Sequence, residues 1–174
     1  MGNLICYLTG RKKENSFMEV PNNNITARET MGYEMKKKSI REYQFRIVYE
    51  DTDAGGVVYH ARYLGIAERA RTESVRKAGG RLADLINEHG YIVVVRQLEI
   101  QYRKPLFLDD LTTVTTTALT VLGASCWLSQ VFRRGDEIVT EMKVQIVCLK
   151  KGEYTPVPFP PKWQRILGLL SEEE

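Results

Sequence analysis

The hydrophobic period of this chain changes at Gly90, and that change restricts the folds the chain can adopt. Between residues 61 and 90, apolar side chains recur at helical spacing in one long and one short segment. After Gly90, apolar and polar residues alternate, which is typical of half-buried antiparallel strands. An earlier β-prone run lies around Phe45. One strand, a long helix and four later strands predict an α+β fold in which a single antiparallel sheet wraps the helix.

The helical pattern predicts a long helix over residues 61–78 and a short one over 82–88. Gly79 directly follows the long helix, and Gly90 follows the short one after His89, as helix C-termini favour. The long helix has one broad face of small and apolar side chains, which lets a sheet approach closely. That face comprises Tyr63, Ala67, Ala70 and Ser74, joined by Leu64, Ile66 and Val75.

The alternating pattern predicts strands up to the proline-rich segment 156–161, where four of the six prolines fall. In the first strand after Gly90, we expect Val94, Leu98, Ile100 and Tyr102 to share one face. The later strands are expected over 111–122, 125–132 and 138–148. A short terminal helix follows, and we interpret its apolar stripe as packing residues: Trp163, Ile166, Leu167 and Leu170.

Composition favours one folded domain with a basic extension. The chain has 174 residues and 43% apolar content, enough for one ordinary core. Residues 1–40 hold seven Lys or Arg and four acids, whereas the remainder holds 18 of each. We therefore predict a disordered N-terminal extension over 1–40 and a folded domain over 41–170. A formally neutral domain argues against nucleic acid as a partner.

Cysteine usage and hydropathy limit the compartment and the kinds of site. The three cysteines, Cys6, Cys126 and Cys148, are widely spaced and include no C-x-x-C pair, so neither a disulfide framework nor a zinc site is indicated. No apolar run is long enough to span a bilayer. We expect a cytoplasmic protein, with the basic clusters of the extension allowing peripheral contact with an acidic inner-membrane surface.

The residues suited to chemistry gather between Tyr49 and Arg76. Three acids, Glu50, Asp51 and Asp53, precede a Gly55-Gly56 pair, and His60 follows just before the predicted long helix. Helix starts carry unpaired backbone N–H groups and a partial positive charge, which stabilise an oxyanion. A carboxylate at Asp53 could attack an acyl carbon or activate water, while His60 orients substrate or donates a proton. The parts suit acyl transfer to water.

A purely structural interpretation of the same residues stays open. Asp and Gly clusters commonly form turns or helix caps, and a histidine beside Tyr59 commonly makes structural hydrogen bonds. Glu68, on the predicted helix, is compatible with an exposed surface acid that pairs with Arg71 or Thr72.

The run YEDTDAGGVVYHARY from Tyr49 to Tyr63, followed by ERARTE from Glu68 to Glu73, closely resembles the signature of hotdog-fold acyl-CoA thioesterases of the 4-hydroxybenzoyl-CoA thioesterase type. The nearest likeness is to their Tol-Pal-associated, YbgC-type branch. The resemblance covers about residues 43–167, which is most of the chain. It implies the hotdog fold, hydrolysis of an acyl-CoA, and neither a metal nor an organic cofactor.

Site residues are carried over where the motif matches. The resemblance implies that Asp53 is the essential carboxylate, as nucleophile or general base, and that the backbone N–H at His60 polarises the thioester carbonyl. The His60 side chain and Tyr49 match two further positions linked with activity. Glu68 lies where some more distant thioesterases place their catalytic acid, which makes it the second-choice carboxylate. We also expect five residues to contact the substrate, Arg69 and Arg103 through the CoA phosphates: Val58, Tyr59, Glu68, Arg69 and Arg103.

The resemblance further implies a homodimer, or a homotetramer built from dimers, with active sites between protomers. Substrate could also arrive on an acyl carrier protein. Two other functions are weighed against hydrolysis. A hotdog hydratase or dehydratase also pairs an acid with a histidine, but the segment from Asp53 to His60 lacks the Asn-Pro usual there. A non-catalytic dimer that binds acyl-CoA or an acyl carrier protein has no need for Asp53, His60 and Tyr49 together.

Overall fold

The computed structural model describes residues 40–171, which form one five-stranded antiparallel sheet in the order β1-β3-β4-β5-β2 with helices packed against it. The strands are β1 (Glu42–Arg46), β2 (Tyr91–Tyr102), β3 (Leu111–Leu122), β4 (Ser125–Arg134) and β5 (Glu137–Lys150). The helices are α1 (Arg62–Lys77), α2 (Leu82–His89) and α3 (Pro161–Gly168), with a 3₁₀ turn η1 (Tyr49–Asp51). The predicted α+β class is confirmed. The predicted extension over 1–40 lies, except for Ile40, outside the described residues.

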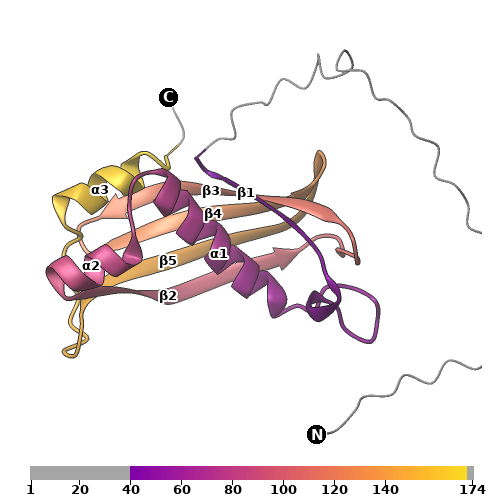
Figure 1. The fold of residues 1–174 in the computed structure, drawn as a ribbon, viewed down its shortest axis with the longest axis horizontal. Helices are drawn as coiled ribbons and strands as arrows, with labels where there is room; N and C mark the ends of the chain where they lie inside the picture. The colour runs from indigo at the N-terminus through magenta and orange to yellow at the C-terminus, as the bar shows by residue number, and fades with distance from the viewer. Residues whose placement is uncertain (1–39, 172–174) are drawn as a thin grey trace, which may run out of the picture. The chain divides into compact units, whose positions relative to one another are not determined.

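Helix α1 crosses one face of the sheet, and α2 and α3 lie near the end of the sheet where α1 ends (Figure 1). The loop that leads into α1 lies at the opposite end. None of the helices within residues 40–171 has the length and apolar character needed to cross a membrane.

The small face predicted for α1 is the face that packs on the sheet. Ala67, Ala70 and Ser74 have no exposed surface, and Tyr63 is 3% exposed. Leu64 was expected on this face, but it is 40% exposed, because it lies on the helix edge that the sheet does not reach. At the far end Gly79 adopts a φ of 90°, which ends the helix at little steric cost.

The predicted face of β2 is wrong in its first half. Val94 pairs with Val147, outside the main packing clusters, whereas Val93 pairs with buried Cys148 and Leu98 pairs with buried Val144. A register shift between Val95 and Gln97 inserts one residue and moves the apolar face by one position. Simple alternation cannot anticipate such a bulge.

Two buried clusters fill the space between helices and sheet. The loop cluster lies under the start of α1 and includes Ile47, Val58, Tyr63, Leu106 and Phe132. The α3 cluster lies under the end of α1. It buries the whole stripe predicted for the terminal helix, which comprises Trp163, Ile166, Leu167 and Leu170.

A pair of glycine substitutions tests this packing. A Cβ at Gly80 would lie 2.9 Å from Val75 Cγ1 and 3.0 Å from Ile166 Cδ1, so we expect Gly80→Ala to lower the free energy of unfolding by about 1 kcal/mol. Gly65, inside α1, has open space around it, so Gly65→Ala should raise the free energy of unfolding by about 0.5 kcal/mol. Equilibrium urea unfolding measures the free energy of unfolding of both variants. Equal changes in the two variants would contradict the close packing of Gly80 against Val75 and Ile166.

Candidate active site

Residues 47–60 form the loop between β1 and α1, and both ends of this loop are fixed in the core. Ile47 is fully buried and Val58 is 5% exposed. The Ile47 N–H donates to the Asp110 carbonyl at 3.0 Å, and the Val58 N–H donates to the Leu106 carbonyl at 2.9 Å. The segment that leads into β3 therefore holds the loop at two points.

The first aspartate of the loop, Asp51, is structural. Its side chain is buried, accepts a hydrogen bond from the Val48 N–H at 3.0 Å, and accepts two from the Arg62 guanidinium at 3.0 and 2.7 Å. Its carbonyl accepts the Tyr59 N–H at 2.9 Å. Asp51 and the neighbouring Glu50 raise the pKa of Arg62, chiefly through the hydrogen bonds to Asp51. Asp51 thus fixes the loop to the first residue of α1.

The second aspartate, Asp53, is exposed at the tip of the same loop. Its Oδ1 accepts the Gly55 N–H at 2.7 Å, and within residues 40–171 no group donates to its Oδ2. A Cβ at Gly55 would lie 3.0 Å from Oδ1, so a side chain there would crowd the carboxylate. Gly56, at a φ of 77°, closes the turn through an N–H bond to the Asp53 carbonyl. The carboxylate is held in place, yet one oxygen is open to solvent.

His60 lies directly before α1, as the sequence predicts. Its carbonyl accepts a hydrogen bond from the Tyr102 hydroxyl at 3.0 Å, and its ring packs on Tyr59 with centroids 4.4 Å apart. Among the described residues none accepts the His60 backbone N–H. Ala61, the N-cap, provides no side-chain cap. The Arg62 and Leu64 N–H groups of the first turn already bond the Tyr59 and Ala61 carbonyls, whereas the His60 N–H just ahead of α1 stays available to a ligand.

An open hollow adjoins the start of α1. Its lining includes Val57, Val58 and His60 from the loop and Tyr102 and Arg103 from the end of β2. Asp53 is not part of this lining, but its N–H bonds the Val57 carbonyl at 2.9 Å, so the loop tip borders the hollow. Arg103 pairs with Glu141, and the neighbouring Lys104 pairs with Glu137. The two cationic side chains are 53% and 54% exposed, so an anionic ligand can compete for them.

The remaining predicted residues lie apart from this hollow within one chain. Tyr49 is 81% exposed on η1. Arg69 lines a separate surface hollow with Glu50 and Asp51. Glu68 forms an ion pair with Arg71, which is the structural alternative that its position on the helix suggested.

Sequence reasoning missed a buried polar network around Arg71. Its side chain is 9% exposed and donates from Nη1 to Gln130 Oε1 at 2.6 Å, as well as bonding Glu68. Gln130, fully buried on β4, donates to the Ala67 carbonyl at 2.9 Å and to Thr116 Oγ1 at 3.1 Å. The only sequence signal was a glutamine at an inward position of a strand.

Other nucleophiles and metal centres find no support in the described part of the chain. Cys126 and Cys148 are free, and burial raises their pKa to about 12 and about 11, so both remain protonated thiols at neutral pH. Across residues 40–171, no group of three His, Cys, Asp or Glu side chains could hold a metal ion. The loop before α1 offers an exposed carboxylate at Asp53 and an unbonded backbone N–H at His60.

Comparison with known proteins gives the same picture. The family model described as the thioesterase-like superfamily matches residues 47–167. The acyl-CoA thioesterase YbgC of Haemophilus influenzae is 42% identical over 118 residues, covering 68% of this chain and 87% of that protein. A 1,4-dihydroxy-2-naphthoyl-CoA hydrolase of Thermosynechococcus vestitus is 29% identical over 133 residues, covering 74% and 91%. The crystal structure of a probable thioesterase from Bartonella henselae superposes with a TM-score of 0.65 at 34% identity, covering 68% of this chain and 98% of that one.

The family match spans the loop, the long helix and the strands β2 to β5, so the sequence-based predictions of family, hotdog fold and enzyme class, a thioester hydrolase, are confirmed. The chain belongs to the thioesterase-like superfamily.

Proposed function

We propose that this protein hydrolyses acyl-CoA thioesters, with Asp53 as the reacting carboxylate and the start of α1 as the site that polarises the thioester carbonyl. The observation that carries this proposal is the state of Asp53, with Oδ1 fixed by the Gly55 N–H and Oδ2 free, on a loop that leads directly into the helix. The names of the relatives, an acyl-CoA thioesterase and an aromatic acyl-CoA hydrolase, support CoA as the carrier.

Two routes use the same groups. As a general base, Asp53 takes a proton from water, and the hydroxide adds to the carbonyl carbon. The C–S bond then breaks, and the departing CoA thiolate receives the proton from Asp53. As a nucleophile, Asp53 adds to the carbon itself and expels the thiolate, and water then hydrolyses the mixed anhydride. In both routes the developing oxyanion accepts a hydrogen bond from the His60 backbone N–H and is stabilised by the positive end of α1.

The surrounding residues have proposed supporting roles. Arg103, with Lys104, faces the CoA phosphates at the edge of the hollow, where each exchanges a carboxylate partner for a phosphate oxygen. Val58 and Tyr59 support the thioester from the loop. Tyr49 remains a proposed catalytic residue, although its exposed ring needs substrate or a second chain to cover it. Arg69 and Glu68 contact the substrate from the outer face of α1.

We also propose a homodimer that forms through β2. This strand is one edge of the sheet, and within residues 40–171 no strand covers its outer side. Val95, 47% exposed, lies in an apolar run on that edge. A second β2 strand would satisfy the open backbone groups and cover the run. Further association into a tetramer through other faces is compatible with this arrangement.

The proposed setting is a reducing cytoplasm, which the two free, buried thiols suit. Within this setting, we also consider that an acyl carrier protein delivers the substrate and that the protein contacts the inner membrane. Release of thiol from acyl-CoA and from acyl carrier protein substrates, measured side by side, separates the two donors.

Asp53→Asn tests the reacting carboxylate. We expect kcat on the best acyl-CoA substrate to fall by about 10²- to 10⁴-fold, because the amide neither accepts the proton nor attacks the carbon. The thermal midpoint should change little, since Asp53 is exposed. Asp51→Asn is the matched control, and it should lower the midpoint by several degrees because Asp51 is buried and bonded to Arg62. If the Asp53 variant turns over substrate at the parent's rate, Asp53 is not the reacting carboxylate.

His60→Ala separates the backbone donor from the side chain. The N–H at position 60 survives this change, so we expect a smaller loss of kcat than for Asp53→Asn. His89→Ala, at the end of α2, serves as the histidine control and should match the parent. Complete loss in His60→Ala would instead give the imidazole the main role.

Val95→Lys tests the edge strand. The added charge lies on the edge that we assign to the second protomer, so the mass measured by light scattering should fall from dimer to monomer. Leu122→Lys places the same charge at the 56% exposed end of β3 and should leave the mass unchanged. A dimer that persists in Val95→Lys means that the chains associate elsewhere.

A further inference from the structure

A hydrogen bond from β2 reaches the residue that carries the proposed oxyanion donor. The Tyr102 hydroxyl donates to the His60 carbonyl at 3.0 Å. Tyr102 is the last residue of β2 and follows His60 by 42 residues in the chain. Sequence reasoning placed Tyr102 only on the apolar face of its strand, and the proposed reaction gives its hydroxyl no role.

Two bonded carbonyls fix the backbone on both sides of His60. The Tyr59 carbonyl accepts the Arg62 N–H at 2.8 Å. In a planar trans peptide the C=O and the N–H point in opposite directions, so this bond directs the His60 N–H away from Arg62. The Tyr102 hydroxyl fixes the next peptide through the His60 carbonyl. The two bonds together set the backbone torsion angles of His60, and hence the direction of its N–H.

The helix itself does not satisfy the His60 carbonyl. A regular α-helical bond would run to this carbonyl from the N–H of Leu64, four residues on. The Leu64 N–H instead bonds the Ala61 carbonyl at 3.2 Å. The peptide after His60 therefore lies outside the helical hydrogen-bond ladder, and Tyr102 supplies from β2 the bond that the helix does not.

The Tyr102 ring is itself held by the core. It packs edge-to-face on Tyr63 with centroids 5.2 Å apart, and Tyr63, which is 3% exposed, packs on buried Phe132. In the sheet, Tyr102 pairs with fully buried Thr140 on β5. Partial burial raises the pKa of the Tyr102 hydroxyl, so the hydroxyl stays protonated and can donate at neutral pH. The core therefore fixes the position of this donor.

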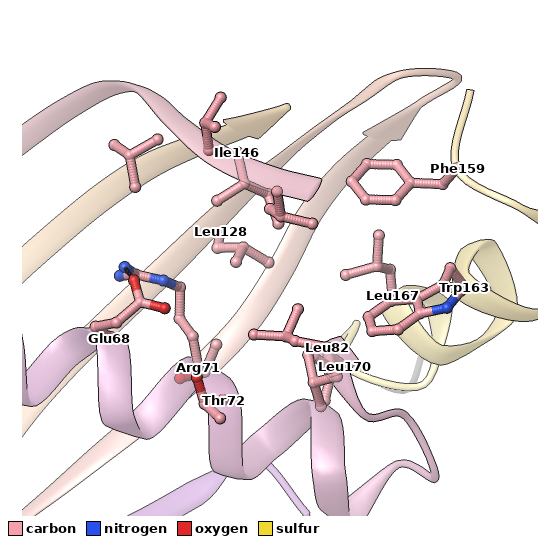
Figure 2. A pocket seen from close by; sticks show the side chains of 15 residues that line it. Glu68, Arg71, Thr72, Leu82, Leu128, Ile146, Phe159, Trp163, Leu167 and Leu170 are labelled. Atoms are coloured by element: carbon pink, nitrogen blue, oxygen red, sulfur yellow. Dashed lines mark hydrogen bonds and ion pairs between the residues drawn. The ribbon is translucent and has the colours of Figure 1, made fainter. Parts of the chain in front are cut away.

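The rest of α1 is held without Tyr102. Further along the helix, the side chains of Glu68 and Arg71 lie together as an ion pair (Figure 2). Arg71 also bonds buried Gln130 on β4. Loss of the Tyr102 hydroxyl should therefore free the peptide after His60 and leave the helix in place.

We propose that Tyr102 is a positioning residue, whose hydroxyl holds the peptide after His60 so that the His60 N–H points at the thioester carbonyl. The inference rests on the proposed function for the identity of that ligand. Tyr102 and His60 both line the hollow beside the start of α1, so the bond lies next to the space that the thioester enters. A donor whose direction is already fixed needs no reorganisation when the oxyanion develops.

Tyr102→Phe removes the hydroxyl and keeps the ring. We expect kcat on acyl-CoA to fall by about tenfold, a fraction of the roughly 10²- to 10³-fold lost when an oxyanion donor is removed outright. KM and the thermal midpoint should keep the parent's values, because the wall of the hollow and the other contacts of α1 remain. Tyr91→Phe, at the opposite end of β2, is the matched control and should keep the parental kcat. An unchanged kcat in Tyr102→Phe overturns the proposal.

Replacing Tyr102 by 3,5-difluorotyrosine tests the donor and keeps the hydroxyl oxygen. Fluorine lowers the pKa of the phenol toward neutrality, and the phenolate that forms above this pKa accepts hydrogen bonds but donates none. The kcat of this variant, relative to the parent, should therefore fall as the pH rises through the lowered pKa. The same replacement of Tyr91 should follow the parental pH profile. Identical profiles for the two replacements mean that the Tyr102 hydroxyl does not act as a donor.

A carbonyl probe tests the direction of the His60 N–H without turnover. In the ketone analogue of hexanoyl-CoA, CH₂ replaces the thioester sulfur, so the compound is not hydrolysed. The infrared band of its ¹³C-labelled carbonyl should move to lower wavenumber on binding to the parent, because an accepted hydrogen bond weakens C=O. Tyr102→Phe should reverse part of this shift, and Tyr91→Phe should not. Hexyl-CoA, a thioether without the carbonyl, should bind all three proteins equally. The same band position in the parent and Tyr102→Phe overturns the proposal.

The proposed reaction and this inference fail separately. A parent that hydrolyses no acyl-CoA removes the proposed reaction, while a ketone band that moves in Tyr102→Phe keeps the positioning role. A parent that hydrolyses acyl-CoA, with kcat and the ketone band unchanged in Tyr102→Phe, keeps the reaction and removes Tyr102 from it.

Discussion

Helix α1 must lie against the sheet while its first turn stays accessible to solvent. The face that meets the sheet is built from small side chains, with Ala67, Ala70 and Ser74 fully buried. Close approach lets the sheet bond directly to the helix, since Gln130 on β4 donates to the Ala67 carbonyl. Gln130 also receives the Arg71 guanidinium, which offsets the cost of burying that charge beside Glu68. The position of the helix start, and of the loop before it, follows from this contact.

The loop shows how burial separates two identical side chains. Asp51 and Asp53 are two residues apart, yet Asp51 is buried under Arg62 and Asp53 faces solvent with one free oxygen. Arg62 connects the loop to the helix because it is both the first residue of α1 and the ion-pair partner of Asp51. Charge on Asp51 fixes the geometry, and the same charge on Asp53 remains available for chemistry.

Most of the fold could be predicted because its elements carry strong periodic signals. The strand over 111–122 and the buried stripe of α3 follow directly from spacing. The face of Val94 could not be predicted, since a single inserted residue in β2 reverses the alternation without changing composition. The roles of Asp51 and Arg71 were hidden for another reason, because a charged residue shows no sequence mark of burial when its partner lies far along the chain. Asp53 and His60 were found through motif resemblance, whereas the buried bonds of Gln130 depend on how the helix packs on the sheet.

The Tyr102 hydroxyl bond to the His60 carbonyl joins the last residue of the edge strand to the loop residue just ahead of the N-cap of the long helix. Whatever attaches to that edge therefore also acts on the peptide that leads into the helix. If two chains do associate there, dilution and catalysis are thermodynamically linked. The specific activity of each subunit then rises with enzyme concentration and levels off once association is complete.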